Sequence, residues 1–228
     1  MHYRNQDPRE YPSILGIFEN EVEVDFTIYD YLLKESKYTR SGRKLDDGKI
    51  RALSWHWTGN AGAGAKGHYR FFSGLNGRYA SYNLMIGLDA NVYVLIPPGE
   101  VAWHSGPSQN TKQETLDLLN GHLPNHATIG ISFCHKDWDG EPTTDQLETM
   151  VALGAYLCDR YDLDPEIHNI RHFDCTGKEC PRWFVRNEDK WDAFLESIKT
   201  TLKEKPLLSK IHSMVVEALG EDEVKEVQ

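Results

Sequence analysis

The stretch 171–181 constrains this chain more than any other part of its sequence. Within it, His172 is followed by Lys178 and then by Cys180, which stands directly before a proline. Imidazole nitrogens and thiolate sulfurs are good zinc ligands, and a loop that turns at Gly177 can bring two of them together. A catalytic zinc takes three ligands from the protein and leaves one position for water. The fold therefore has to supply a third ligand from elsewhere.

A candidate third ligand lies on a predicted strand over residues 50–58. Alternation along this strand separates an apolar set from a polar set, namely Leu53, Trp55 and Trp57 against Ser54, His56 and Thr58. His56 therefore points away from the apolar face, just before a glycine and an asparagine break the strand. A histidine on a strand is more often a structural group than a ligand, so this position alone leaves both interpretations open.

The four cysteines do not indicate a disulfide framework. They are irregularly spaced in a chain of 228 residues without a visible export signal: Cys134, Cys158, Cys175 and Cys180. We expect Cys134 and Cys158 to be small buried hydrophobic residues. Cys175 is ambiguous from its position, and we expect a structural role for it. Cys180 is the expected metal ligand.

Charge and hydropathy exclude several classes of protein. A formal net charge of −10 argues against a nucleic-acid partner. No apolar run approaches the roughly 20 residues that a membrane span requires. Residues 1–7 are polar and lead into no apolar segment, so we expect synthesis in the cytoplasm without a signal peptide. The sequence does not indicate an oligomeric state.

The rest of the chain interleaves short strands with helices. A helix is predicted at 65–73, and strands at 82–88, 92–96 and 129–133, the first two joined by a turn of hairpin character. Residues 107–127 are polar and rich in turn formers, which is typical of a surface loop beside a site. This order predicts an α/β fold with a mixed central sheet flanked by helices.

Helical patterns dominate the C-terminal half. Thr143 and Gln146 form a capping box for a helix expected to bury Leu147, Met150, Val151, Leu157, Cys158 and Tyr161. Asn187 is expected to cap a second helix that Pro206 ends. A last amphipathic helix carries Leu207, Ile211, Val215 and Leu219. We divide the chain into an N-terminal extension (1–37, with a strand or hairpin near 22–29), a main domain (38–203) and a C-terminal helix with a charged tail (204–228).

Four blocks occur in an order that carries a family resemblance. They are Leu53–Asn60, Ala102–Gly106, Thr128–Ile131 and the stretch 171–181. Together they resemble the zinc-dependent N-acetylmuramoyl-L-alanine amidases, the family that includes phage endolysins and the peptidoglycan recognition proteins. The resemblance covers roughly residues 38–200. It implies a mixed sheet flanked by helices, with the zinc in a groove at one edge.

The resemblance also implies roles for individual residues. Zinc would be held by His56, His172 and Cys180, while Lys178 and Tyr82 match catalytic positions of the family. We interpret three further residues as lining the groove. His104 would contact substrate or support the ligands. Trp57 and Trp103 would stack on a sugar or peptide, although core packing is as common for such tryptophans.

The chain departs from many relatives at two positions. Asn83 stands where many carry histidine, and Ser132 stands where many carry a glutamate that acts as a base. A serine hydroxyl is no useful proton acceptor near neutral pH. We therefore expect Tyr82 and Lys178 to do this work, with Lys178 facing the developing oxyanion and Tyr82 donating or relaying a proton.

The expected function is hydrolysis of the amide bond between N-acetylmuramic acid and L-alanine in bacterial peptidoglycan. Two imidazoles and one thiolate leave zinc with one net positive charge, enough to lower the pKa of a bound water towards about 7. An enzyme of this kind would act on the cell wall after release, as an endolysin does. Two alternatives are a muropeptide-binding module without activity and a domain in which zinc is purely structural. The presence of Cys180 favours the enzyme, since non-catalytic relatives commonly lose this ligand.

Overall fold

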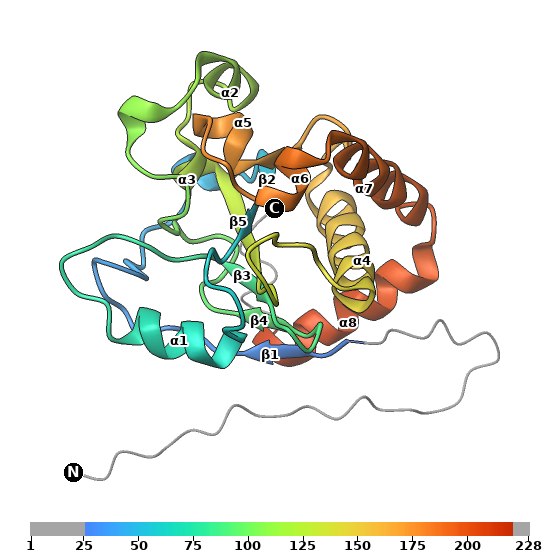
Figure 1. Cartoon of the computed structure of the whole chain (residues 1–228), viewed down its shortest axis with the longest axis horizontal. Helices are drawn as coiled ribbons and strands as arrows, with labels where there is room; N and C mark the ends of the chain where they lie inside the picture. The colour runs from blue at the N-terminus through green and yellow to red at the C-terminus, as the bar shows by residue number, and fades with distance from the viewer. Residues whose placement is uncertain (1–25, 221–228) are drawn as a thin grey trace, which may run out of the picture.

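A six-stranded mixed sheet forms the centre of the computed structural model, which describes residues 26–220 (Figure 1). Its strands are β1 (Ile28–Asp30), β2 (Ala52–Trp57), β3 (Leu84–Ile86), β4 (Val92–Val94), β5 (Thr128–Phe133) and β6 (Asn169–Arg171). They lie in the order β1-β4-β3-β5-β2-β6. All neighbours run parallel except β3 and β4, which form the predicted hairpin. The α/β prediction is confirmed.

Helices cover both faces of this sheet (Figure 1). They are α1 (Ala65–Ser73), α2 (Gln113–Leu118), α3 (Pro124–Ala127), α4 (Thr144–Tyr161), α5 (His172–Thr176), α6 (Arg182–Arg186), α7 (Glu188–Thr201) and α8 (Lys205–Leu219), with short 3₁₀ turns at Asp46–Gly48 and Ser108–Asn110. Helix α4 contacts both α7 and α8, and these three helices share the larger hydrophobic core with the sheet. Helix α1 packs over the other face through Ala65 and Phe72.

The two faces of strand β2 have different roles: one contributes to the hydrophobic core, and the other carries polar side chains. Leu53 and Trp55 point into the larger core, where the Trp55 ring meets Phe194 edge to face at a centroid distance of 5.1 Å. Ser54 and His56 lie on the opposite face, as alternation predicts. Strand β2 is flanked by β5 and β6, and all six of its residues are buried.

Helix α4 begins at the predicted capping box. The Thr143 side chain accepts a hydrogen bond from the backbone of Gln146, and the Gln146 side chain accepts one from the backbone of Thr143. Met150 and Cys158 are buried as expected. Leu147 is 36% exposed, so the prediction that it is buried was wrong. It lies at the start of the helix, beside a surface groove.

Three local predictions differ from the structure. Residues 107–127 lie beside the cavity at their start, as predicted, but they contain α2 and α3 and are not a plain loop. Asn187 occupies the N-cap position of α7, but its side chain donates to the carbonyl of Trp183 instead of capping the helix. Helix α7 ends at Thr201, and Pro206 lies in the first turn of α8, where its missing N–H costs no hydrogen bond.

The two ends of the described chain pack against the same side of the molecule. Strand β1 pairs with β4, and α8 contacts both β1 and α4. Strand β1 belongs to the segment interpreted as an N-terminal extension, and the division into three parts stays a prediction. The predicted strand residues 22–25 and the charged tail from 221 lie outside the described residues. Within residues 26–220, no helix has both the length and the apolar character needed to cross a membrane.

Candidate zinc site and catalytic cavity

Three segments bring the predicted ligands together at one edge of the sheet. His56 lies near the carboxyl end of β2, and β6 leads directly into α5, whose first residue is His172. Helix α5 ends at Thr176 and is capped by Gly177, which adopts the left-handed conformation (φ 80°) that glycine tolerates best. The chain then returns to Cys180, so both loop ligands face the strand ligand.

The ligand atoms converge closely enough to hold one metal ion. Nδ1 of His56 lies 3.1 Å from Nδ1 of His172 and 3.7 Å from Sγ of Cys180. All three ligand atoms lie within 4.8 Å of one another, and all three residues are buried. Across residues 26–220 no other group of histidine, cysteine or acidic side chains meets these conditions. Two nitrogens and one sulfur are the donor set that zinc prefers, so the residues present fit a zinc ion.

Burial sets the protonation of this group before any metal binds. It lowers the pKa of His172 to about 4, with a further contribution from the charge of Lys178, and it lowers the pKa of His56 well below its usual range. Both imidazoles are therefore neutral at pH 7, as metal ligands must be. Burial raises the pKa of the Cys180 thiol to about 11. The backbone N–H of Trp57 and the charge of Lys178 act in the opposite direction but do not cancel this rise. A bound cation favours the thiolate and reverses this shift.

A buried arginine stabilises the loop that carries two of the ligands. The guanidinium of Arg171 binds the Asp174 carboxylate at 3.0 Å and that of Glu188 at 2.7 Å, and it donates to the carbonyl of Phe184. Its charge also lies 5.3 Å from the centre of the Trp191 ring. These contacts tie β6 and α5 to α6 and α7.

The segment before α2 binds the same loop from the other side. The backbone N–H of Lys112 donates to the carbonyl of Cys175 at 2.8 Å, and its ammonium group donates to the carbonyl of Phe173 at 3.0 Å. The Thr115 hydroxyl donates to the carbonyl of Asp174 at 3.0 Å. Three consecutive carbonyls of α5 are thus satisfied by one short segment. No local pattern predicts this arrangement, because its partners lie some 60 residues apart in the chain.

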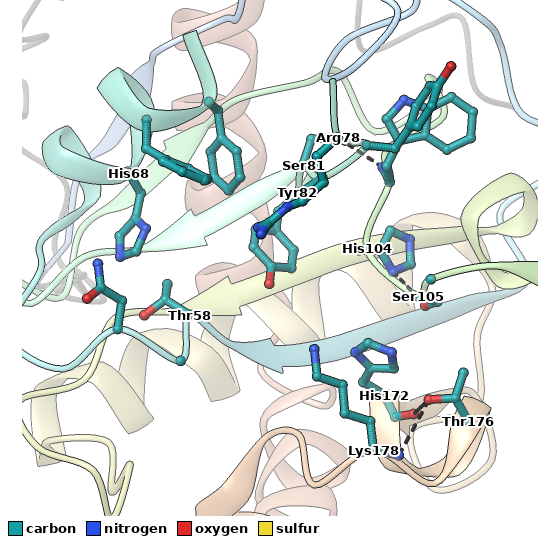
Figure 2. Close-up of a pocket in the computed structure, with 18 of the residues that line it drawn as sticks. Thr58, His68, Arg78, Ser81, Tyr82, His104, Ser105, His172, Thr176 and Lys178 are labelled. Carbon is teal, nitrogen blue, oxygen red and sulfur yellow. Dashed lines mark hydrogen bonds between the residues drawn. The ribbon is translucent and has the colours of Figure 1, made fainter. Parts of the chain in front are cut away.

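A cavity of about 950 Å³ opens beside the ligands (Figure 2). His104, His172, Lys178 and Tyr82 all line it, and Figure 2 shows their polar ends turned toward a common space. Trp103 lines it as well. Trp57 does not, because alternation places it on the core face of β2, where its ring stacks on His135 at 4.4 Å. The substrate contact expected of Trp57 is therefore not retained.

The cavity carries positive charge and no carboxylate. Arg78 and Lys178 line it, whereas none of its described lining residues is an aspartate or glutamate. Tyr82 is partly buried, and the desolvation of its hydroxyl raises the pKa of that group, while the Ser132 hydroxyl partly opposes the shift. Ser132 pairs in register with His56 on the neighbouring strand. The position where the resemblance led us to look for a carboxylate base thus holds a small neutral serine.

Asn83 has a structural role. Its side-chain amide donates to the carbonyls of Pro97 and Glu100, and its side-chain oxygen accepts from the backbone of Gly130. These bonds join β3, β5 and the loop after β4 behind the cavity.

His104 lies directly behind the strand ligand. Its Nδ1 is 3.1 Å from Nε2 of His56, and Ser54 Oγ is 3.0 Å from the same nitrogen of His56. The sequence predicts a role for His104 but not for Ser54 or for Thr128, whose hydroxyl lies 3.4 Å from Nε2 of His104. Ser54 could have been predicted to lie beside His56, because alternation along β2 places both side chains on the same face of the sheet.

Comparison with known proteins identifies relatives for most of the chain. A sequence model of the N-acetylmuramoyl-L-alanine amidase family matches residues 46–183. The N-acetylmuramoyl-L-alanine amidase BlyA of Bacillus subtilis (strain 168) is 33% identical over 175 residues, which are 75% of this chain and 46% of BlyA. A probable N-acetylmuramoyl-L-alanine amidase of Bacillus licheniformis is 28% identical over 181 residues, 78% of this chain and 49% of that protein. The chain thus spans about half the length of these relatives.

Solved structures share the fold. A mutant endolysin from Bacillus subtilis matches with a TM-score of 0.57 and 23% identity, over 76% of this chain and 99% of the endolysin. The PlyG catalytic domain matches with a TM-score of 0.60 and 21% identity, over 78% of this chain and 96% of that domain. At these identities the likeness establishes the architecture.

Proposed function

Because the chain belongs to the N-acetylmuramoyl-L-alanine amidase family, we propose that it hydrolyses the amide bond between N-acetylmuramic acid and L-alanine in bacterial peptidoglycan. We further propose that it uses zinc held by His56, His172 and Cys180. The observation that carries the proposal is the buried group of these three residues beside a cavity that also presents Lys178 and Tyr82. The site of action would be the cell wall.

A zinc ion in this site would act as a Lewis acid that polarises a carbonyl and lowers the pKa of a water molecule. The number of protein ligands favours a catalytic role for the metal over a purely structural one. Structural zinc sites take four protein ligands, whereas the described residues bring three together next to an open cavity.

The roles of the chain's own polar groups follow from their positions. The ammonium group of Lys178 faces the cavity and would stabilise the negative charge that develops on the carbonyl oxygen as the amide is attacked. The hydroxyl of Tyr82 keeps its proton at neutral pH because burial raises its pKa, so it acts as a hydrogen-bond donor. It would hold the same oxygen or pass a proton to the leaving amine.

The cavity also suits the substrate. Its volume of about 950 Å³ is large enough for a ligand of several amino-acid residues or sugar units. Arg78 and Lys178 make it cationic within a protein of net charge −10, which favours the carboxylate-bearing peptide of peptidoglycan. Trp103 offers an aromatic surface at the cavity wall, and His104 contacts the strand ligand at the back of the site.

One observation favours a second candidate function, a module that binds muropeptide without cleaving it. Ser132 supplies no base, and none of the cavity-lining residues within 26–220 is an aspartate or glutamate. Two measurements on the purified protein separate the candidates: its zinc content by elemental analysis, and the release of L-alanine amino termini from purified cell walls by mass spectrometry.

We expect about one zinc per chain and new L-alanine termini, and we expect Cys180→Ser to lose both. Muropeptide binding without new termini would establish the binding module. Cleavage that persists after removal of zinc by a chelator would rule out the zinc mechanism.

A further inference from the structure

A histidine can bind a metal through Nδ1 only if its proton is on Nε2. Nδ1 of His56 is the atom that faces His172 and Cys180, so the proton of His56 has to point the other way. There, Nε2 meets Ser54 Oγ at 3.0 Å and His104 Nδ1 at 3.1 Å. A serine hydroxyl can donate or accept, so Ser54 does not determine the tautomer. The state of His104 does.

The tautomer of His104 is set in turn by Thr128. The Thr128 hydroxyl donates to the carbonyl oxygen of Pro124 at 2.8 Å, and a carbonyl oxygen can only accept. Since this bond uses the single hydroxyl proton, Thr128 Oγ1 presents a lone pair to Nε2 of His104, 3.4 Å away. A proton on Nε2 of His104 satisfies that contact, whereas a bare Nε2 would place two lone pairs against each other.

His104 has one ring proton to place. It is 6% exposed, and a buried imidazole without an acidic partner is neutral, with a single ring proton. With that proton on Nε2, Nδ1 of His104 is a hydrogen-bond acceptor. Two groups can donate to this nitrogen: the Ser105 hydroxyl at 2.9 Å and Nε2–H of His56 at 3.1 Å.

The backbone keeps this ring in position. Asn125 Oδ1 accepts from the backbone N–H groups of both His104 and Ser105, at 3.1 and 2.8 Å. The ring lies so close to β5 that a Cβ at Gly130 would stand 2.5 Å from Cδ2 of His104. Only glycine permits this approach.

We propose that Thr128 and His104 are positioning residues which fix the tautomer of His56, so that its Nδ1 is bare before a metal arrives. The hydrogen bonds run in one direction: His56 donates to His104, His104 to Thr128 and Thr128 to Pro124. The proposal rests on the zinc site of the proposed function, but it makes a claim about the zinc-free protein. Partners of this kind typically change metal affinity by about 10- to 100-fold.

The test is a long-range ¹H–¹⁵N NMR spectrum of the zinc-free protein at pH 7, with labelled histidines. We expect the proton on Nε2 for both His56 and His104. Thr128→Val keeps the shape of the side chain but removes the acceptor, so the proton of His104 should move toward Nδ1 and the zinc dissociation constant should rise about tenfold. Thr128→Ser retains the hydroxyl and should restore both properties.

Thr149→Val is the matched control. The Thr149 hydroxyl is also buried and also donates to backbone carbonyls, but it contacts no histidine. This variant should leave the tautomers and the zinc affinity unchanged. A wild-type spectrum with the His56 proton on Nδ1 would overturn the proposal, as would an unchanged zinc affinity in folded Thr128→Val.

If Thr128→Val does not fold, the wild-type spectrum alone decides. A protein that shows the expected tautomers and binds zinc but cleaves no peptidoglycan would contradict the proposed activity and leave this inference standing.

Discussion

The backbone N–H of Phe173 donates a 2.9 Å hydrogen bond to the carbonyl oxygen of Cys180. This bond closes the loop between the two ligands that are close in sequence, because Phe173 directly follows His172. The geometry of the pair is therefore set by main-chain bonding within one loop. Only the distance of that loop from His56 depends on the sheet.

The two cysteines of this loop should respond differently to substitution. Cys180→Ser should lose stoichiometric zinc, because the ligand atom disappears from a site of three. Cys175 is fully buried, and burial raises the pKa of its thiol to about 12. We expect Cys175→Ser to retain zinc and most activity. Elemental analysis of both purified variants checks this, and zinc lost from Cys175→Ser alone would mean that the ligand was wrongly assigned.

Zinc binding should release one proton per ion near pH 7. The thiol of Cys180, with a pKa of about 11, must lose its proton, whereas His172, with a pKa of about 4, has none to lose. Zinc affinity should therefore rise about tenfold per pH unit between roughly pH 6 and 8. Calorimetry in buffers of different ionisation enthalpy counts the protons. A value near two at pH 6 would show that an imidazole is protonated in the free protein.

The zinc-free protein should lose stability as pH falls from 6.5 towards 4. The pKa of His172 is about 4 in the folded chain and 6.5 in the unfolded chain. As pH falls, the unfolded state therefore binds a proton at this histidine before the folded state does. The contribution present above pH 6.5 is on the order of 3 kcal/mol and is lost at about pH 4. Urea unfolding at several pH values measures this loss, which should be smaller in His172→Gln.

Tyr82 and Lys178 should matter for turnover but not for the metal. We expect Tyr82→Phe and Lys178→Ala each to keep zinc while cleavage falls by about a hundred- to a thousandfold. Ser132→Ala should be mild by comparison, since a serine hydroxyl is no useful proton acceptor near neutral pH. Release of L-alanine termini is the readout. If Tyr82→Phe is as fast as wild type, the tyrosine has no catalytic role and His104 is the next candidate.

The hydrogen bonds from Lys112 and Thr115 to the carbonyls of α5 should support the metal site without contacting the metal. Lys112→Met keeps the aliphatic part of the side chain but loses the bond to the carbonyl of Phe173. We expect zinc to bind about tenfold more weakly, since support of the ligand loop is lost. Gln113→Ala is the control from the same segment, because Gln113 is exposed and bonds only to Asp117 among side chains. Equal zinc affinity in Lys112→Met and Gln113→Ala would contradict a role for the Lys112 side chain in supporting the ligand loop.

Local sequence rules predicted a good part of this fold. The helix Ala65–Ser73, the capping box of α4 and the two faces of β2 all follow from patterns within a few residues. The site's ligand types were equally visible, because His172 and Cys180 share one loop. Each of these features depends on neighbours in the chain.

What could not be predicted depends on contacts between distant segments. Helix α2 has few apolar residues, and bonds from Lys112 and Thr115 to α5 help to hold it. The pairing of His104 with His56 joins residues 48 positions apart. No spacing rule relates the two, so the contact could be found only once β2 and the loop after β4 were placed.

The pairing of β1 with β4 has a consequence for anyone who trims this protein. The segment matched by the family, 46–183, contains β4 but neither β1 nor α8. A fragment cut to those limits would present the outer backbone edge of β4 to solvent, together with the apolar surface that α8 covers. Such open strand edges recruit other chains. A shortened version made for fusion or display would therefore be prone to self-association, even though every residue of the proposed zinc site was retained.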